Sequence, residues 1–239
     1  MEDINFGCFA MLLKNKNLIY FSSFYFVLAA CSDHTSNTSD KVYGIDVSWH
    51  QGEIDWSKVK EWEGHEIAFV YMKATEGGDH VDVKYQTNIL EARKSGLPVG
   101  GYHYFRTTST VEEQFENFTH QMSISEQDLV PLVDVEENKY WSDDEFHENL
   151  QKFLNLLEQH YGKKPMIYAV NTFYNKHLQG KYKNYHFLIG RYGNEPWMKD
   201  NSNYTIWQFS ESGRVDGIPK SVDIDVFNTK YSLQDIMLP

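Results

Sequence analysis

The chain has 239 residues, of which 41% are hydrophobic, 15% aromatic and 23% charged, and its formal net charge is −12. This length and composition suit one large globular domain with a sizeable core. The negative charge argues against a nucleic-acid binder, because such proteins gather basic residues in a patch or stripe on their surface. The high aromatic content fits either a well-filled core or a cleft whose rings support sugars.

The first segment has the layout of a secretory signal peptide. Lys14 and Lys16 precede an apolar stretch over residues 18–30, which is too short for a comfortable membrane span. The stretch ends in Leu-Ala-Ala-Cys at Cys31, which resembles a bacterial lipobox, where the signal is cut before a cysteine that carries lipid. We therefore expect a signal peptide over residues 1–31 and lipidation of Cys31. An ordinary signal peptide or an uncleaved anchor is the alternative.

The segment after this signal, residues 32–41, is polar and has no periodicity, as in a flexible linker. The other cysteine, Cys8, also precedes the folded region, so residues 42–239 contain no cysteine. This excludes disulfides, a thiolate nucleophile and cysteine-ligated zinc from that region. We expect an exported, lipid-anchored bacterial envelope protein, at the outer membrane or the cell surface, that contacts the membrane only through its anchor.

Strand-like and helix-like segments alternate from residue 42 onward. Near-continuous apolar runs predict strands, and periodic apolar stripes with capping residues predict helices. We expect strands at 42–49, 67–77, 98–105, 129–137 and 164–170. We expect helices between them at 55–62, 83–95, 109–122 and 142–162.

The second half of this region has a different pattern. Three more strands are predicted at 186–193, 204–211 and 221–228, separated by short segments with at most a turn of helix near 172–178. Eight strands result, with real helices only among the first five. The pattern predicts an α/β fold, an irregular TIM-like parallel barrel with five β/α units followed by three strands.

Acidic residues lie near the ends of several predicted strands, where parallel barrels place their catalytic side chains. The polar positions are Asp46 on the first strand, Lys73 and Glu76 on the second, Asp134 and Glu136 on the fourth, and Asp223 and Asp225 on the eighth. The acids alternate with apolar residues, so Asp134 and Glu136 share one face, which we expect to be the barrel interior. One such acid is often only a helix cap or a salt-bridge partner, but acids on three separate strands favour a catalytic cluster.

Paired carboxyl groups on one face suit acid catalysis. Two residues rise roughly 6.6 Å along a strand. Carboxylates this close raise each other's pKa, which keeps one protonated as a general acid near neutral pH.

Metal and cofactor chemistry has little support in the sequence. Oxygen ligands for Mg²⁺ or Ca²⁺ are present, but His50 and His103, the histidines near predicted strand ends, form no spaced pair. We expect no metal and no cofactor, and a surface or hydrogen-bonding role for both histidines. The sequence has no P-loop, dinucleotide glycine motif or G-x-S-x-G elbow.

Five segments carry a resemblance to a known family. They are YGIDVSWHQGEIDWSKVK (43–60), FVYMKATEGG (69–78), GYHYF (101–105), PLVDVEE (131–137) and IWQFSESGRVDGIPKSVDIDVF (206–227). In this order they resemble glycoside hydrolase family 25, the lysozymes of the Chalaropsis type, over about residues 42–231. The resemblance implies a single catalytic barrel domain over residues 42–239. It also implies cleavage of the β-1,4 bond between N-acetylmuramic acid and N-acetylglucosamine in peptidoglycan.

The resemblance also implies roles for individual residues. Glu136 matches the general acid, Asp134 is its partner in the D-x-E motif, and Asp46 and Asp223 complete the acidic cluster. We expect Asp134 to stabilise the substrate's N-acetyl group or the developing positive charge. Substrate-binding residues would be Lys73, Glu76, Tyr104, Tyr168, Arg191, Trp207 and Asp225, the last at a position where the family often has Asn.

Three other functions remain open at this point. A chitinase-like hexosaminidase would use the same D-x-E arrangement, and a non-catalytic lipid-anchored barrel would bind glycans without cutting them. A metal-dependent phosphodiesterase barrel is the third. The expected partner is the peptidoglycan glycan strand, bound by a monomer, and the mechanism could be retaining, inverting or substrate-assisted.

Overall fold

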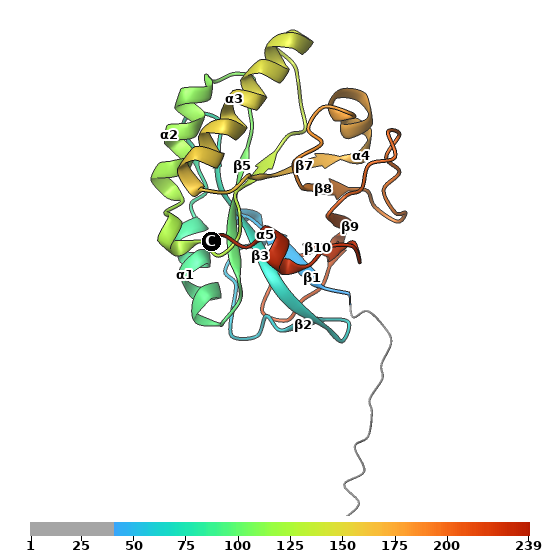
Figure 1. The fold of residues 1–239 in the computed structure, drawn as a ribbon. Coiled ribbons are helices and arrows are strands. Elements are labelled where there is room, and N and C mark those ends of the chain that lie inside the picture. The colour runs from blue at the N-terminus through green and yellow to red at the C-terminus, as the bar shows by residue number, and fades with distance from the viewer. Residues whose placement is uncertain (1–40) are drawn as a thin grey trace, which may run out of the picture. The chain divides into compact units, whose positions relative to one another are not determined.

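The computed structural model describes residues 41–239, and the predicted signal peptide, Cys31 and nearly all of the predicted linker lie outside the described residues. Within the described part, eight strands close into a barrel in the order β1-β10-β9-β8-β7-β6-β5-β3, because β1 also pairs with β3 (Figure 1). This confirms the predicted eight-stranded α/β barrel. The strands are β1 Tyr43–Val47, β3 His65–Glu76, β5 Val99–Tyr104, β6 Leu132–Asp134, β7 Met166–Val170, β8 Phe187–Gly190, β9 Ile206–Gly213 and β10 Val222–Phe227.

The last strand runs against its neighbours. The strands β1, β3 and β5 to β9 are parallel along the barrel, whereas β10 is antiparallel to both β1 and β9. The prediction of a wholly parallel barrel is therefore wrong for β10. The sequence pattern could not show this, because period-two alternation is the same in both chain directions.

Three long helices cover one side of the barrel (Figure 1). They are α1 Tyr85–Lys94, α2 Val111–Gln121 and α3 Asp143–Tyr161, and each follows a predicted strand. The predicted caps are present, since the Ser142 side chain accepts from the Glu145 N–H and Gly162 ends α3 with φ 75°. After β7 come α4 Asn171–Phe173 and the π-helical turn η3 Tyr174–Leu178, and shorter helices are η1 Trp49–Gln51, η2 Ile124–Glu126 and α5 Leu233–Ile236.

The predicted helix at 55–62 is wrong. A turn follows η1, and then β2 Glu61–Trp62 pairs with the start of β3 through a two-residue turn whose residues both have positive φ. The backbone here bonds to distant segments instead, with Asp55 N–H donating to the Gly217 carbonyl at 2.9 Å. A second short strand, β4 His80–Val81, pairs with the other end of β3.

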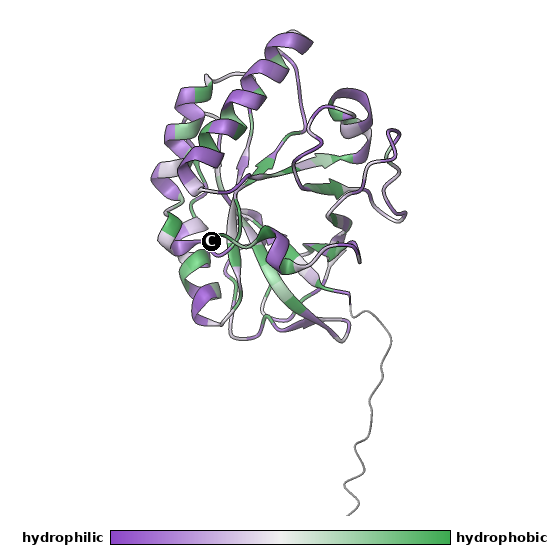
Figure 2. Ribbon diagram, in the orientation of Figure 1, coloured by the Kyte–Doolittle hydropathy of each residue, from purple (hydrophilic) through white to green (hydrophobic). Residues whose placement is uncertain are grey.

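Two apolar layers hold this fold together. The outer layer lies between strands and helices, and the α3 stripe of Phe146, Leu150, Phe153, Leu154 and Leu157 is fully buried in it. In Figure 2 apolar colour runs along the strands and the covered faces of the helices, while polar colour marks their outer faces. Burial of each such side chain stabilises the fold by about 1.5–3 kcal/mol.

The inner layer fills one end of the barrel. Its members include Phe69, Leu132, Met166, Ile206 and Phe227. The Phe69 ring is so close to Gly44 that a Cβ at this position would lie 2.3 Å from it. Only glycine therefore fits on β1 here. No helix within residues 41–239 has both the length and the apolar composition that a membrane crossing needs.

Candidate active site

A cavity of about 180 Å³ opens at the other end of the barrel interior, where the parallel strands finish. Four of its lining residues are the four acids predicted to be catalytic, Asp46, Asp134, Glu136 and Asp223. The other lining residues are Tyr102, Leu132, Tyr168, Leu188, Tyr192 and Gln208. The structure thus brings together acids from three separate strands, as the alternation in the sequence indicates.

The strand ends deliver these acids in two ways. Asp134 is the last residue of β6, and Glu136 follows two residues later on the same face, while Val133 and Val135 are buried in the outer layer. Asp223 is the second residue of β10 and lies opposite Asp46 in the strand register. An early residue of β10 reaches this rim only because β10 is antiparallel.

The pair formed by Asp46 and Asp223 retains protons unusually well. Burial raises the pKa of Asp46 to about 8, with a smaller contribution from the Asp225 carboxyl, and a hydrogen bond from Gln208 acts against the rise. Burial and the neighbouring Asp46 raise the pKa of Asp223 to about 8. At neutral pH the pair can therefore carry protons that ordinary carboxyl groups would have lost.

The D-x-E pair is shifted in the same direction. Burial raises the pKa of Asp134 well above its usual range, and the carboxyl groups of Glu136 and Asp46 raise it further. Burial also raises the pKa of Glu136, against hydrogen bonds from Tyr104 and Tyr168. Asp134 Oδ1 is buried and has no hydrogen-bond partner among the described residues. It therefore has an unused acceptor that a bound substrate could fill.

Gln208 links the acids to the tyrosines of the cavity. Its Nε2 donates to Asp46 Oδ2 at 2.8 Å, and its Oε1 accepts from the Tyr168 hydroxyl at 3.0 Å. The Tyr192 hydroxyl also donates to Gln208 Oε1, at 3.3 Å. These contacts fix the orientation of the Asp46 carboxyl.

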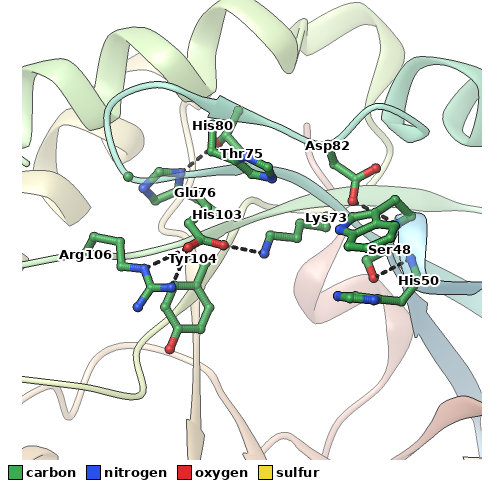
Figure 3. A network of polar contacts seen from close by, with 12 residues as sticks. Ser48, His50, Lys73, Thr75, Glu76, His80, Asp82, His103, Tyr104 and Arg106 are labelled. Carbon is green, nitrogen blue, oxygen red and sulfur yellow. Dashed lines mark hydrogen bonds and ion pairs between the residues drawn. The ribbon is translucent and has the colours of Figure 1, made fainter.

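An ion-pair network borders Tyr104 at the cavity rim (Figure 3). Lys73 Nζ donates to Glu76 Oε2 at 2.6 Å, and Arg106 Nε donates to Glu76 Oε1 at 2.8 Å. The Arg106 guanidinium lies over the Tyr104 ring, 4.3 Å from its centroid. The Tyr104 hydroxyl in turn approaches Glu136 Oε2 at 3.4 Å, so the network positions a ring that contacts the predicted general acid.

Glu137, which directly follows the D-x-E pair, forms ion pairs with two basic residues. It accepts from Arg106 Nη1 at 2.8 Å and pairs with Lys139. Its carboxyl group is thus paired with two cations, and Glu137 does not line the cavity.

Of the predicted substrate-binding residues, Tyr168 lines the cavity and six others do not. Three of the six, Lys73, Glu76 and Tyr104, belong to the network at its rim, and the other three lie further away. Trp207 packs against the outer layer, and its Nε1 donates to the Arg191 carbonyl at 2.7 Å. Arg191 lines a neighbouring groove. Asp225 is completely buried deeper in the barrel, and neither of its carboxyl oxygens has a hydrogen-bond partner among the described residues.

Sequence reasoning missed four residues of this region. Tyr102 and Gln208 line the cavity, and a signal was present for Tyr102, because it shares a face with Tyr104. Tyr192 and Arg106 stand in loops, where no periodicity indicates where a side chain points.

The two histidines have the roles expected from the sequence. His103 is buried between Thr75 Oγ1 at 2.7 Å and Gln114 Oε1 at 3.1 Å, and burial lowers its pKa to about 4. His50 is exposed, and its ring packs at a tilt against Trp49, with the ring centroids 3.9 Å apart. In residues 41–239, no three His, Cys, Asp or Glu side chains are grouped as a metal ion requires.

Comparisons with known proteins agree with this geometry. The family model described as glycosyl hydrolases family 25 matches residues 45–218. The chain is 36% identical over 196 residues to the uncharacterized protein YegX of Escherichia coli O157:H7, covering 81% of this chain and 72% of that protein. It is 34% identical over 186 residues to the autolytic lysozyme of Clostridium acetobutylicum, covering 77% and 55% of the two chains.

A solved structure has the same fold. The family 25 glycosyl hydrolase from Bacillus anthracis superposes with a TM-score of 0.71 and 31% sequence identity, over 78% of this chain and 88% of that chain.

Proposed function

Because this chain belongs to glycosyl hydrolases family 25, we propose that its acidic cavity is the site at which it hydrolyses peptidoglycan. The chain is a glycoside hydrolase of the lysozyme type, and its relatives do not support the hexosaminidase or glycan-binding alternatives. The bond cut is the β-1,4 bond between N-acetylmuramic acid and N-acetylglucosamine. The observation that carries this function is the convergence of four carboxyl groups, from three strands, on one cavity in a chain of this family.

In the proposed mechanism Glu136 is the general acid. Burial raises its pKa and so favours the protonated form, which gives its proton to the glycosidic oxygen as the bond to C1 breaks. The Tyr104 hydroxyl, 3.4 Å from Oε2, stabilises the carboxylate that remains.

Asp134 acts on the other side of the same bond. Its buried, unpartnered Oδ1 suits acceptance of a hydrogen bond from the N–H of the substrate's 2-acetamido group. That contact would orient the acetamido oxygen toward C1 and stabilise the positive charge that develops there. Lys73 lowers the pKa of Asp134, against the larger rise caused by burial and by the carboxyl groups of Glu136 and Asp46.

Asp46 and Asp223 support this reaction from the opposite strands. Their shared retention of protons limits the negative charge in the cavity, since four ionised carboxylates would repel each other strongly. We assign them to binding of sugar hydroxyls and to setting the pKa of the D-x-E pair.

We also propose a location for the protein. The chain is exported and held at the bacterial envelope by lipid on Cys31, and it acts there as a monomer. A Cys31→Ser variant should lose incorporation of a labelled fatty acid and leave the detergent phase for the aqueous phase. Unchanged labelling would contradict the anchor, and size-exclusion chromatography with light scattering tests the monomer.

End-group chemistry tests the function. Purified peptidoglycan is digested, the new ends are reduced with borohydride, and the reduced sugar is identified by mass spectrometry. Reduced muramic acid supports the proposal, whereas reduced glucosamine or the absence of new ends contradicts it. Loss of activity in EDTA would instead favour a metal-dependent enzyme.

A further inference from the structure

A second groove adjoins the catalytic cavity at the ends of β7 and β8. It encloses about 480 Å³ and is lined by Val170, Asn171, Thr172, Asn175, Gly190, Arg191, Tyr192, Trp197 and Lys199. Tyr192 lines both this groove and the cavity, so the two are adjacent. The volume lies in the range of about 300–1,000 Å³ that is usual for ligand sites. We name it the Trp197 groove.

Trp197 is an exposed ring on a fixed backbone. Its side chain is 62% exposed, yet its carbonyl accepts from Asn171 Nδ2 at 3.2 Å and from Asn175 Nδ2 at 2.8 Å. Asn171 Oδ1 also accepts from the Trp197 N–H, and Asn175 Oδ1 from the Lys199 N–H. Both asparagines are buried at 7% exposure. The fold thus fixes the backbone that presents this large ring to solvent, which lowers the entropy cost of binding a flat partner.

Two cations accompany this ring. Arg191 Nη1 donates to the Glu195 carbonyl at 2.7 Å, and neither Arg191 nor Lys199 forms an ion pair with any residue in 41–239. The nearby Asp200 is already occupied, since it accepts from the Tyr174 hydroxyl at 3.0 Å and the Gly180 N–H at 2.7 Å. In a chain of net charge −12, this pair of free cations indicates an anionic ligand.

We propose that the Trp197 groove binds the part of the glycan strand next to the bond being cut, with a sugar ring on Trp197 and a carboxylate of its attached peptide on Arg191 and Lys199. The C–H face of a sugar complements the negative face of an aromatic ring. Carboxylates form charge-assisted hydrogen bonds with guanidinium and ammonium groups. The inference rests on the proposed function and adds Trp197 and Lys199 to the residues that recognise the substrate.

Two variants test the groove with three substrates. Trp197→Ala and Lys199→Glu are compared on long soluble glycan strands with peptides, on the same strands after an amidase has removed the peptides, and on a short peptide-free oligosaccharide. Leu90→Ala and Lys94→Met, exposed positions on α1, are the matched controls.

We expect Trp197→Ala to lower kcat/KM on both kinds of long strand by about tenfold, through KM, and to affect the short oligosaccharide much less. Lys199→Glu should lower kcat/KM about tenfold on peptide-bearing strands and much less on stripped strands. High salt should reduce the difference between peptide-bearing and stripped strands in the loss caused by Lys199→Glu, because salt screens exposed charges. The controls should behave as the wild type does.

The outcomes separate the two proposals. An equal loss on all substrates, or no loss, overturns the groove while the proposed function stands. A wild-type protein that cuts none of the strands contradicts the proposed function itself. If Trp197→Ala fails to fold by circular dichroism, Lys199→Glu still decides, because Lys199 is exposed and only its backbone N–H is bonded within the fold.

Discussion

The two ends of the barrel interior are built from the same strands but differ in chemistry. At one end Leu132 and Ile206 pack into the apolar layer, of which Leu132 also reaches the cavity. Two residues further along the same strands, Asp134 and Gln208 line the cavity. Alternation therefore decides which face a side chain takes, and position along the strand decides whether that face is core or active site.

Asp225 lies between these two regions on β10. It is two residues from Asp223 in the cavity and two from Phe227 in the apolar layer. Burial raises its pKa well above the usual range, with a smaller effect from Asp223. Asp225 is therefore as buried as the residues of the apolar end, although it is an acid like the residues of the cavity. Its carboxyl group also raises the pKa of Asp46.

Replacing the proton donor should have the largest effect, and it should lower activity without lowering stability. We expect Glu136→Gln to lower kcat by about a thousandfold or more, within the range that general acids contribute. The thermal midpoint should change little, because Gln keeps the side-chain volume. Turnover on peptidoglycan, measured by release of reducing ends, checks this. Near-normal activity would remove Glu136 from its assigned role.

The apolar end should show the opposite behaviour. Phe69→Ala removes a fully buried ring that meets Phe227 edge-on at 5.3 Å, and we expect it to lower the free energy of unfolding by about 3–5 kcal/mol. Urea denaturation measures this loss. Activity per folded molecule should stay close to that of the wild type. A selective loss of activity without loss of stability would contradict the division between the two ends.

Asp134→Asn should cost somewhat less activity than Glu136→Gln, about a hundredfold in kcat. Asn keeps the oxygen that accepts from the acetamido N–H but cannot carry the negative charge. An N-acetylated substrate should therefore lose more than a substrate without the acetamido group. Equal losses on both substrates would argue against a contact between Asp134 and that group.

The buried acids should also make the stability of the fold depend on pH. Folding raises the pKa of Asp46 and of Asp223 from 3.8 to about 8, so the folded state binds more protons than the unfolded state between these values. The free energy of unfolding should therefore fall as pH rises from about 4 to about 8. Asp46→Asn removes one of these groups and should make the dependence shallower. Urea titrations of both proteins across this range measure the slopes, and a wild-type slope of the opposite sign would contradict the shared-proton arrangement.

Much of this architecture can be predicted from local patterns. Apolar runs predict the strands, the α3 stripe and its caps predict that helix, and alternation predicts that Asp134 and Glu136 share the interior face. Tertiary contacts account for the failures. Trp56 and Val59 have helical spacing, but hydrogen bonds from this segment to Gly217 and Ile67 hold it in a turn.

Other features of the site are harder to predict from the sequence. In IWQFS both sets of alternate positions contain apolar residues, so the pattern does not decide that Gln208 faces the cavity and Trp207 the outside. The asparagines that hold Trp197 act on backbone atoms more than twenty residues away, and no periodicity reports such contacts.

Because β10 runs against its neighbours, the chain both enters β1 and leaves β10 at the same end of the described barrel. Tyr43 enters β1 and Phe227 leaves β10 at the apolar end, side by side with Ile67 and Ile206. Eight strands in one direction would instead have released the chain beside the catalytic opening. A tether joined ahead of β1, or a fusion joined after β10, therefore pulls from behind the cavity, so that an immobilised enzyme presents its open end toward the polymer.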